Sequence, residues 1–280
     1  MFLWSTGFIA AKYITPYAEP FTFLTYRYFL AGLILFVVAY IVREKFALTK
    51  KQFWQSVTVA VMLHVIYIGG VFYAVSLGVT SGVSAVIVSL QPVLVGILAV
   101  PILGERLRGI QIVGLILGVV GVAILLLPKI FEGDISTSFS AAGIIVCVIA
   151  LLGTTGGYIV QKKTGADIPF ITGTAIQYGV SAIIFAGLAL TLEDNSVQWT
   201  NEFIFGLSWS ILANSIVSIV ILYTLLRHGS AQRASSLYYL VPPAAALMAY
   251  FLFDERITSV GLVGMALAGL GVMLVMRENS

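Results

Sequence analysis

Residues 91–106 read QPVLVGILAVPILGER, and residues 241–256 read VPPAAALMAYFLFDER. In both stretches a proline is followed thirteen positions later by Glu-Arg, and the two stretches lie 150 positions apart. At this shift, residues 92–122 and 242–272 are identical at nine of 31 positions, and GFIAAK at 7–12 lies opposite GYIVQK at 157–162. Both halves of the chain take part, which indicates a duplicated unit.

The composition is typical of a membrane protein. Of the 280 residues, 60% are apolar and 10% are charged, and the mean hydropathy is +1.04. An ordinary soluble domain is about half apolar and about a quarter charged. The apolar runs approach the ~20 residues that a helix needs to cross a bilayer, and they are too long for the ~10-residue strands of a barrel. We therefore predict an all-α integral membrane protein.

Ten apolar runs are present, so we expect ten transmembrane helices. The first run begins almost at Met1 with no basic segment before it, which indicates a short first helix rather than a cleaved signal peptide. The expected spans are 2–14, 21–42, 54–76, 82–101, 109–127, 141–161, 170–192, 203–226, 232–253 and 259–276.

Lysine and arginine predict the orientation. Eleven of them lie on one side of the expected spans and three on the other, with Arg27 inside a span. The positive-inside rule places the richer side in the cytoplasm, so both termini are expected there, with the protein in the inner (plasma) membrane. The net charge of +3 comes from this asymmetry. The expected partners are therefore membrane lipid and a small-molecule substrate, with no nucleic acid.

The sequence gives no sign of an enzyme. The single cysteine, Cys147, excludes an intramolecular disulfide or a cysteine metal cluster, and the two histidines, His64 and His228, lie far apart in the span map. We expect no catalytic residues, no metal and no cofactor.

Each repeat holds five expected spans, the first within residues 1–130 and the second within residues 141–280. Because five is odd, the second copy must cross the membrane in the opposite direction. When inverted halves exchange conformations, a site between them opens to each side of the membrane in turn. The pattern therefore predicts a carrier that works by alternating access, with its site near the bilayer midplane.

The repeat, with its Pro…Glu-Arg motif and glycine-rich final helix, resembles the drug/metabolite transporter (DMT) superfamily, EamA type, over essentially the whole chain. The segment RASSLYYLVPPAAALMAYFLFDE, at 233–255, is the strongest local match. The resemblance implies export of amino acids or related small metabolites, driven by a solute or proton gradient. It leaves the substrate open.

Polar side chains inside a membrane usually face the bundle or a water-filled cavity. Ser210, Asn214 and Ser218 stand at i, i+4 and i+8, and therefore share one helix face. The alternative for every such residue is a role in helix packing. The predicted substrate-binding residues are Trp4, Arg27, His64, Gln91, Tyr158, Gln177, Asn214, Ser218 and Tyr239.

For three of these residues the sequence suggests a specific role. His64 and Asn214 lie near the middle of equivalent spans, so they are expected to line the pathway, with an interhelical hydrogen bond as the alternative. His64 is also a candidate proton carrier if transport is coupled to protons. Arg27 could hold a substrate carboxylate as a bidentate donor, or extend to the outer interface and meet Glu19.

Other motifs are expected to be structural. Glu105 and Glu255 stand at helix–helix turns, where a carboxylate favours a helix N-terminus. Pro92, Pro242 and Pro243 predict kinks at matching depths in the fourth and ninth spans. Glycines favour close helix approach within each half, or a homodimer seam; these are Gly114, Gly118, Gly121, Gly261, Gly264 and Gly271.

Two other functions remain as alternatives. An intramembrane serine hydrolase would need Ser84 close to His64, and it would not explain the inverted repeat. The other is a lipid or nucleotide-sugar transporter on the same fold. A nucleotide sugar would need more intramembrane cations than Arg27 and Lys12 to match its phosphates.

Overall fold

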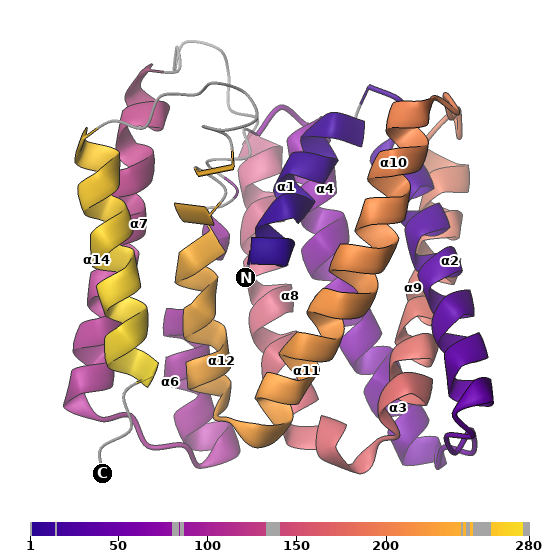
Figure 1. Cartoon of the computed structure of the whole chain (residues 1–280), viewed down its shortest axis with the longest axis horizontal. Coiled ribbons are helices and arrows are strands. Elements are labelled where there is room, and N and C mark those ends of the chain that lie inside the picture. The colour runs from indigo at the N-terminus through magenta and orange to yellow at the C-terminus, as the bar shows by residue number, and fades with distance from the viewer. Residues whose placement is uncertain are drawn as a thin grey trace.

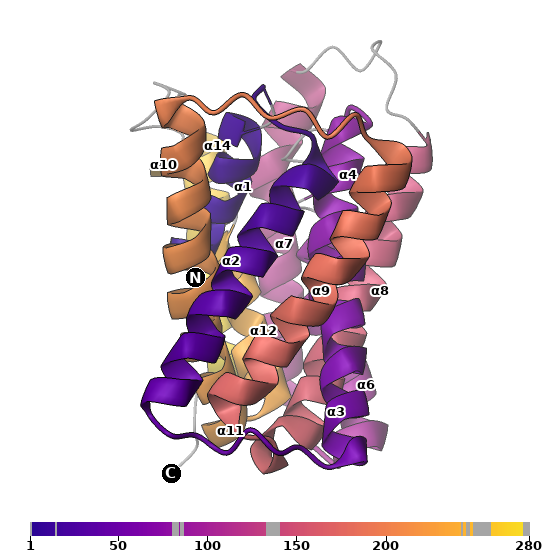
Figure 2. The ribbon, with the colours of Figure 1, turned by 90° about the vertical axis from the view of Figure 1, so that its right-hand side faces the viewer.

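The computed structural model describes residues 2–14, 16–79, 84, 87–132, 141–241, 243–244, 247–248 and 259–276. Over these residues the regular elements are helices, with one isolated bridge between Ala18 and Val197. Figures 1 and 2 show the long helices packed side by side in one bundle. The prediction of an all-α protein is confirmed for this part of the chain.

The first half contains α1 (Phe2–Ile14), α2 (Pro20–Ile41), α3 (Lys50–Val59), the π-helix η1 (Ala60–Gly69), α4 (Gly70–Ser76), α6 (Gln91–Leu103) and α7 (Gly109–Glu132). The second half contains α8 (Ala141–Thr164), the 3-10 turn η2 (Gly165–Asp167), α9 (Phe170–Leu192), α10 (Asn201–Trp209), the π-helix η3 (Ser210–Val217), α11 (Ser218–His228), α12 (Ala231–Ser236), the 3-10 turn η4 (Leu237–Leu240) and α14 (Ser259–Met276). The elements α3, η1 and α4 form one continuous rod, as do α10, η3 and α11.

Within the described residues, six helical stretches are long and apolar enough to cross a membrane. Large apolar side chains cover their outer surface: Ile183 and Leu190, for example, are 74% and 76% exposed. So much exposed apolar surface is stable in lipid and not in water. The protein is therefore a multi-pass membrane protein. The six stretches are Pro20–Ile41, Lys50–Ser76, Ala141–Asp167, Phe170–Leu192, Asn201–His228 and Ser259–Met276.

The expected span 82–101 is not one unbroken helix. Ser89 and Leu90 form a turn, and α6 begins at Gln91 with Pro92 in its first turn. A proline fits there because the first N–H groups of a helix have no partner within the helix. The predicted kink is therefore a helix start. Pro242 and most of residues 242–258 lie outside the described part of the chain.

Helices α2 and α9 pack against each other along their lengths, and each N-terminus is capped from the loop that follows its partner. Glu193 accepts hydrogen bonds from the N–H groups of Phe21 and Thr22, both at 2.7 Å. Glu44 accepts from the N–H groups of Ile171 and Thr172, at 3.2 and 2.6 Å. The capped residues are 150 positions apart, and a carboxylate favours the positive end of a helix.

Helices α7 and α14 form another extensively packed pair. A Cβ at Gly121 would lie 2.4 Å from the nitrogen of Ala268, and one at Gly271 would lie 2.6 Å from the oxygen of Gly114. The glycines therefore let the two backbones approach closely. The expectation of packing within each half was wrong for these residues, because the contact joins the last helices of the two halves.

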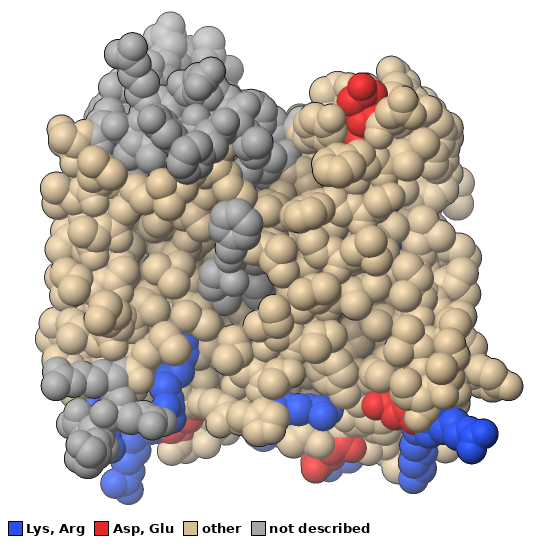
Figure 3. Space-filling model, viewed as in Figure 1, with Lys and Arg blue, Asp and Glu red and all other residues tan. Residues whose placement is uncertain are grey.

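Basic side chains mark one end of the bundle. On the face that Figure 3 shows, lysine and arginine gather at the end where α11 and the chain between α2 and α3 lie. At that end Glu105 accepts a hydrogen bond from the N–H of Ala231, at 2.7 Å. Glu105 thus caps a helix N-terminus, as expected. The capped helix is α12, however, and not α7, which follows Glu105 in the sequence. Glu255 lies outside the described residues.

Candidate functional site

Two π-helical segments interrupt the long rods at equivalent places. η1 begins at Ala60 and η3 at Ser210, which are 150 positions apart. A π-helix uses i→i+5 hydrogen bonds and so frees or redirects backbone groups, and short π segments are frequent at functional sites. His64 lies in η1 and Asn214 in η3, each buried near the middle of its rod.

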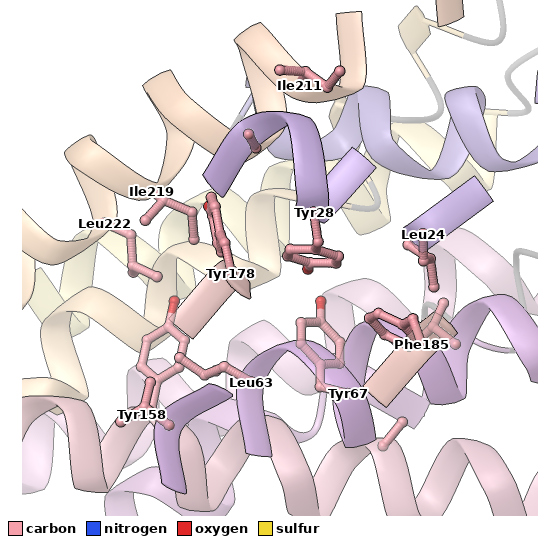
Figure 4. Packing of buried hydrophobic residues seen from close by; sticks show 14 of the residues in the cluster. Leu24, Tyr28, Leu63, Tyr67, Tyr158, Tyr178, Phe185, Ile211, Ile219 and Leu222 are labelled. Atoms are coloured by element: carbon pink, nitrogen blue, oxygen red, sulfur yellow. The ribbon is translucent and has the colours of Figure 1, made fainter. Parts of the chain in front are cut away.

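His64 sits in a group of aromatic rings. Its Nδ1 lies 3.2 Å from the hydroxyl of Tyr28, and its ring centroid lies 5.2 Å from that of Tyr28 and 5.1 Å from that of Tyr178. The other ring nitrogen, Nε2, is buried without a hydrogen-bond partner among the described residues. Figure 4 shows Tyr28 and Tyr178 close together, with Tyr67 and Tyr158 pointing toward them from neighbouring helices. His64 therefore has one nitrogen available to a ligand or water.

Arg27 points into the bundle and not toward the outer surface. It is 5% exposed, its Nε donates to the hydroxyl of Ser215 at 2.8 Å, and its guanidinium lies 5.4 Å from the ring centre of Tyr28. Glu19 instead accepts a hydrogen bond from the N–H of Asp194, at 2.8 Å. The alternative in which Arg27 extends to Glu19 was therefore wrong.

A second set of polar contacts continues from the same helices. The hydroxyl of Tyr178 donates to the backbone oxygen of Ser215. The next residue back, Gln177, accepts from the hydroxyl of Tyr223 at 2.6 Å and donates to Gln161 at 3.4 Å. The polar cluster thus joins α2, η1, α8, α9, η3 and α11 in the interior of the bundle. We call it the central cluster; its members are Arg27, Tyr28, His64, Gln161, Gln177, Tyr178, Ser215 and Tyr223.

Asn214 and Ser218 make their polar contacts outside the central cluster. Asn214 donates to the hydroxyl of Thr6 in α1 at 3.4 Å, and Trp209 donates to the same hydroxyl at 2.9 Å. Ser218 donates to the oxygen of Ala213 in its own rod, at 2.8 Å, which is the local backbone bond that the packing alternative predicts. The side chain of Trp4 lies outside the described part of α1.

Tyr239 and Gln91 also lie outside the central cluster. Tyr239 packs into the seam between α7 and α14, where a Cβ at Gly118 would lie 2.3 Å from its ring. Its neighbour Tyr238 instead meets the ring of Tyr158 edge-on, with centroids 5.6 Å apart. Gln91 is fully buried at the start of α6, and both polar atoms of its amide lack a partner within the described residues.

Ser84 and His64 contact different partners. The Ser84 hydroxyl lies 3.4 Å from the sulfur of Cys147, whereas His64 pairs with Tyr28. A nucleophilic serine needs a base within hydrogen-bond reach. The hypothesis of a pair between Ser84 and His64 was therefore wrong.

Sequence reasoning missed Tyr28, Tyr178, Ser215 and Tyr223 as site candidates. The 150-residue shift contained part of the signal, because it places Tyr28 opposite Tyr178 and Tyr73 opposite Tyr223. The predicted set nevertheless includes only Tyr158 and Tyr239 among the tyrosines. Ser215 is adjacent to the predicted polar face of Ser210, Asn214 and Ser218. That face assumes α-helical spacing, whereas the segment Ser210–Val217 is a π-helix, in which side chains point in different directions.

Comparison with known proteins decides the family. The model of the EamA-like transporter family matches residues 1–127 and again residues 141–277. The chain belongs to the EamA-like transporter family. As a member of this family it is a membrane transporter, and the resemblance noted from the sequence is confirmed.

Relatives of this EamA-like transporter carry similar descriptions. The uncharacterized transporter YvbV of Bacillus subtilis is 26% identical over 99% of this chain and 89% of its own length. A protein of Escherichia coli named as a probable amino-acid metabolite efflux pump is 25% identical over 72% of this chain and 70% of its own. A solved crystal structure has the same fold, with a TM-score of 0.81, at 16% identity over 98% of this chain and 93% of that one.

Proposed function

We propose that this protein is a secondary transporter that exports amino acids or related small metabolites by alternating access. The driving force is a solute or proton gradient. The two inverted repeats are residues 1–130 and 141–280, and the substrate site is the central cluster between them.

The observation that carries this proposal is a pair of similar contacts, one in each half. Tyr28 in α2 hydrogen-bonds to His64 in η1, and Tyr178 in α9 hydrogen-bonds to Ser215 in η3. The two tyrosines are 150 positions apart and each contacts the π segment of its own half, at partners that lie one position apart in the repeat. Two halves with matching contacts around one site can exchange conformations, which is what alternating access requires. The reciprocal caps by Glu44 and Glu193 support the same pseudo-symmetry.

The charge distribution supports the proposed orientation, with both termini and the basic end in the cytoplasm of a cell bounded by its inner (plasma) membrane. At that end Lys162 donates to the backbone oxygens of Leu226, at 2.6 Å, and Gly229. Arg227 donates to the oxygens of Gly165 and Ile168, at 2.8 and 2.6 Å. We propose that these contacts close the cytoplasmic side and break when it opens.

The substrate class and the direction of transport rest on two supports. The Escherichia coli relative is named for efflux of amino-acid metabolites. The central cluster offers a guanidinium, amides, phenols and aromatic rings, which suit a small amphipathic molecule.

The test is counterflow in proteoliposomes that contain the purified protein, with labelled aromatic and aliphatic amino acids and their metabolites. We expect exchange by the wild type and its loss in His64→Ala. The lipid-facing Leu190→Ala is the matched control and should keep full exchange, since Leu190 is 76% exposed. Exchange that persists undiminished in His64→Ala would exclude the central cluster as the site. Absence of exchange for every compound would overturn the proposed substrate class.

A further inference from the structure

Arg27 is a buried cation without an anionic partner in the described structure. Its contacts are the hydroxyl of Ser215 and the ring of Tyr28, both neutral, and it forms no ion pair with any described residue. A buried charge is costly unless a partner of opposite charge or a polar cavity compensates it. An arginine held in this way is either a structural burden or a binding group.

The guanidinium is positioned for a ligand. It has five N–H donors, and only Nε is hydrogen-bonded to a described residue. The two terminal nitrogens are the pair that binds a carboxylate through two parallel hydrogen bonds. Ser215, which holds Nε, receives a hydrogen bond from Tyr178 at its backbone oxygen, so the position of the arginine is itself fixed by α9.

Arg27 also reaches the depth expected of a substrate site. Its Cα lies in the second turn of α2, about 11 Å along the helix from Pro20. Its side chain contacts Ser215, which lies near the middle of the 28-residue rod Asn201–His228. The guanidinium therefore points toward the midplane and away from the nearer interface.

No acid balances this charge within the described spans. Every carboxylate side chain that the structure describes lies at a helix end or in a loop, and several bind backbone N–H groups there. The cluster around Arg27 thus has a cation and no group that would pair with an ammonium. These carboxylates are Glu19, Glu44, Glu105, Asp167, Glu193, Asp194 and Glu202.

We infer that the transported molecule is a net anion whose carboxylate is held by Arg27, with an aromatic or apolar body against Tyr28 and Tyr178. This inference rests on the proposed function and narrows it: within the small metabolites, acids that lack a free ammonium are preferred over zwitterionic amino acids. The physical reason is that a zwitterion would bury its ammonium without a counter-charge, whereas a monoanion neutralises Arg27.

The test uses three compounds of one shape that differ in charge. They are 3-phenylpropionate, phenylalanine and 3-phenylpropionamide, which are an anion, a zwitterion and a neutral amide. Binding to the purified protein is measured by thermal stabilisation in detergent, and transport by counterflow in proteoliposomes. For the wild type we expect half-saturation by the anion at a concentration about ten- to hundredfold lower than by the other two, as for a hydrogen-bonded charge pair.

The variants separate the role of Arg27 from general effects of charge. Arg27→Gln should lose the preference for the anion over the amide, and Arg27→Lys should keep a weakened preference because it retains the charge without the bidentate geometry. Arg106→Gln is the matched control, since Arg106 is exposed at the basic end. It should bind the anion as the wild type does.

Each failure has a distinct meaning. If the wild type prefers phenylalanine, or if Arg27→Gln keeps the preference for the anion, the inference is overturned while the carrier function stands. If the anion binds selectively but no compound is exchanged, the anion site stands and the proposed transport function fails. Because the wild-type comparison needs no variant, the test holds even if Arg27→Gln does not fold.

Discussion

Tyr28 and Tyr178 meet edge-to-face inside the bundle, with ring centroids 5.1 Å apart and ring planes at 72°. They occupy equivalent positions of the two halves, and α2 and α9, which carry them, are capped reciprocally by Glu193 and Glu44. The contact therefore lies on the proposed pseudo-symmetry axis, where two inverted repeats must touch. It is also where the polar contacts of His64, Arg27 and Ser215 converge.

The hydroxyls of these tyrosines are expected to matter more for transport than for stability. Tyr28→Phe removes the partner of His64, and Tyr178→Phe removes the donor to Ser215. Each change should cost about 1 kcal/mol of unfolding free energy, as for a typical hydrogen bond, and should lower the counterflow rate by about tenfold because the site loses its alignment. Tyr40→Phe is the control, since Tyr40 is 72% exposed. Equal rates in all three variants would show that the hydroxyls do not position the site.

The two caps are expected to act independently. Glu44→Gln and Glu193→Gln should each lower the unfolding free energy by about 1 kcal/mol, because each removes a charged acceptor from a helix N-terminus. The caps lie beyond opposite ends of the 22-residue helix α2, about 33 Å apart, so the double variant should show the sum. Unfolding by denaturant in mixed micelles measures this. A strongly non-additive double variant would mean that the ends of the α2–α9 pair are coupled.

Because α7 and α14 pack closely, replacing glycine by alanine should have different effects on stability at different positions of this pair. Gly121→Ala should destabilise the protein by about 1–3 kcal/mol, because the new methyl group would lie 2.4 Å from the nitrogen of Ala268. Gly269→Ala in the same pair of helices meets nothing within 4 Å, and should be neutral or stabilising by about 0.5–1 kcal/mol. The midpoints of thermal unfolding in detergent distinguish the two. Equal effects would argue against the seam.

The proposal that His64 carries protons makes a separate prediction. Uptake by wild-type proteoliposomes should respond to an imposed pH gradient, because an imidazole titrates near neutral pH in water. His64→Gln should abolish that response. Unlike His64→Ala, it should still allow exchange at equal pH on both sides, because the glutamine amide can keep a hydrogen bond to Tyr28. His228→Gln is the control, since His228 is exposed at the end of α11. A pH response that survives in His64→Gln would exclude this role.

The fold was largely predictable because membrane helices must satisfy their own backbone hydrogen bonds, which ties long apolar runs to helices. The sequence could not place the break before Gln91, since a proline predicts either a kink or a helix start. It likewise could not choose the partner of the glycine-rich helices. Gly114 and Gly271 have the same pattern whether they pack within a half, between halves or between two copies.

Some members of the central cluster, which is the proposed site, were predicted from the sequence. His64, Arg27 and Gln177 lie in the central cluster because polar residues in apolar spans must find polar partners. Asn214 and Tyr239 were predicted for the site, but in each case the adjacent residue makes the relevant contact. Ser215 binds Arg27, and Tyr238 packs against Tyr158. A one-residue change of position rotates a side chain by about 100° around a helix, and the π segments shift that register further.

The central claim is that one site between the two halves is reached from both sides of the membrane in turn. The most direct measurement is labelling of Ser215→Cys, in a Cys147→Ser background, by a membrane-impermeant thiol reagent applied separately to each face of oriented vesicles. We predict labelling from both faces, with the transported anion slowing both reactions. Labelling from one face only, or labelling that the anion does not affect, would contradict alternating access at this site.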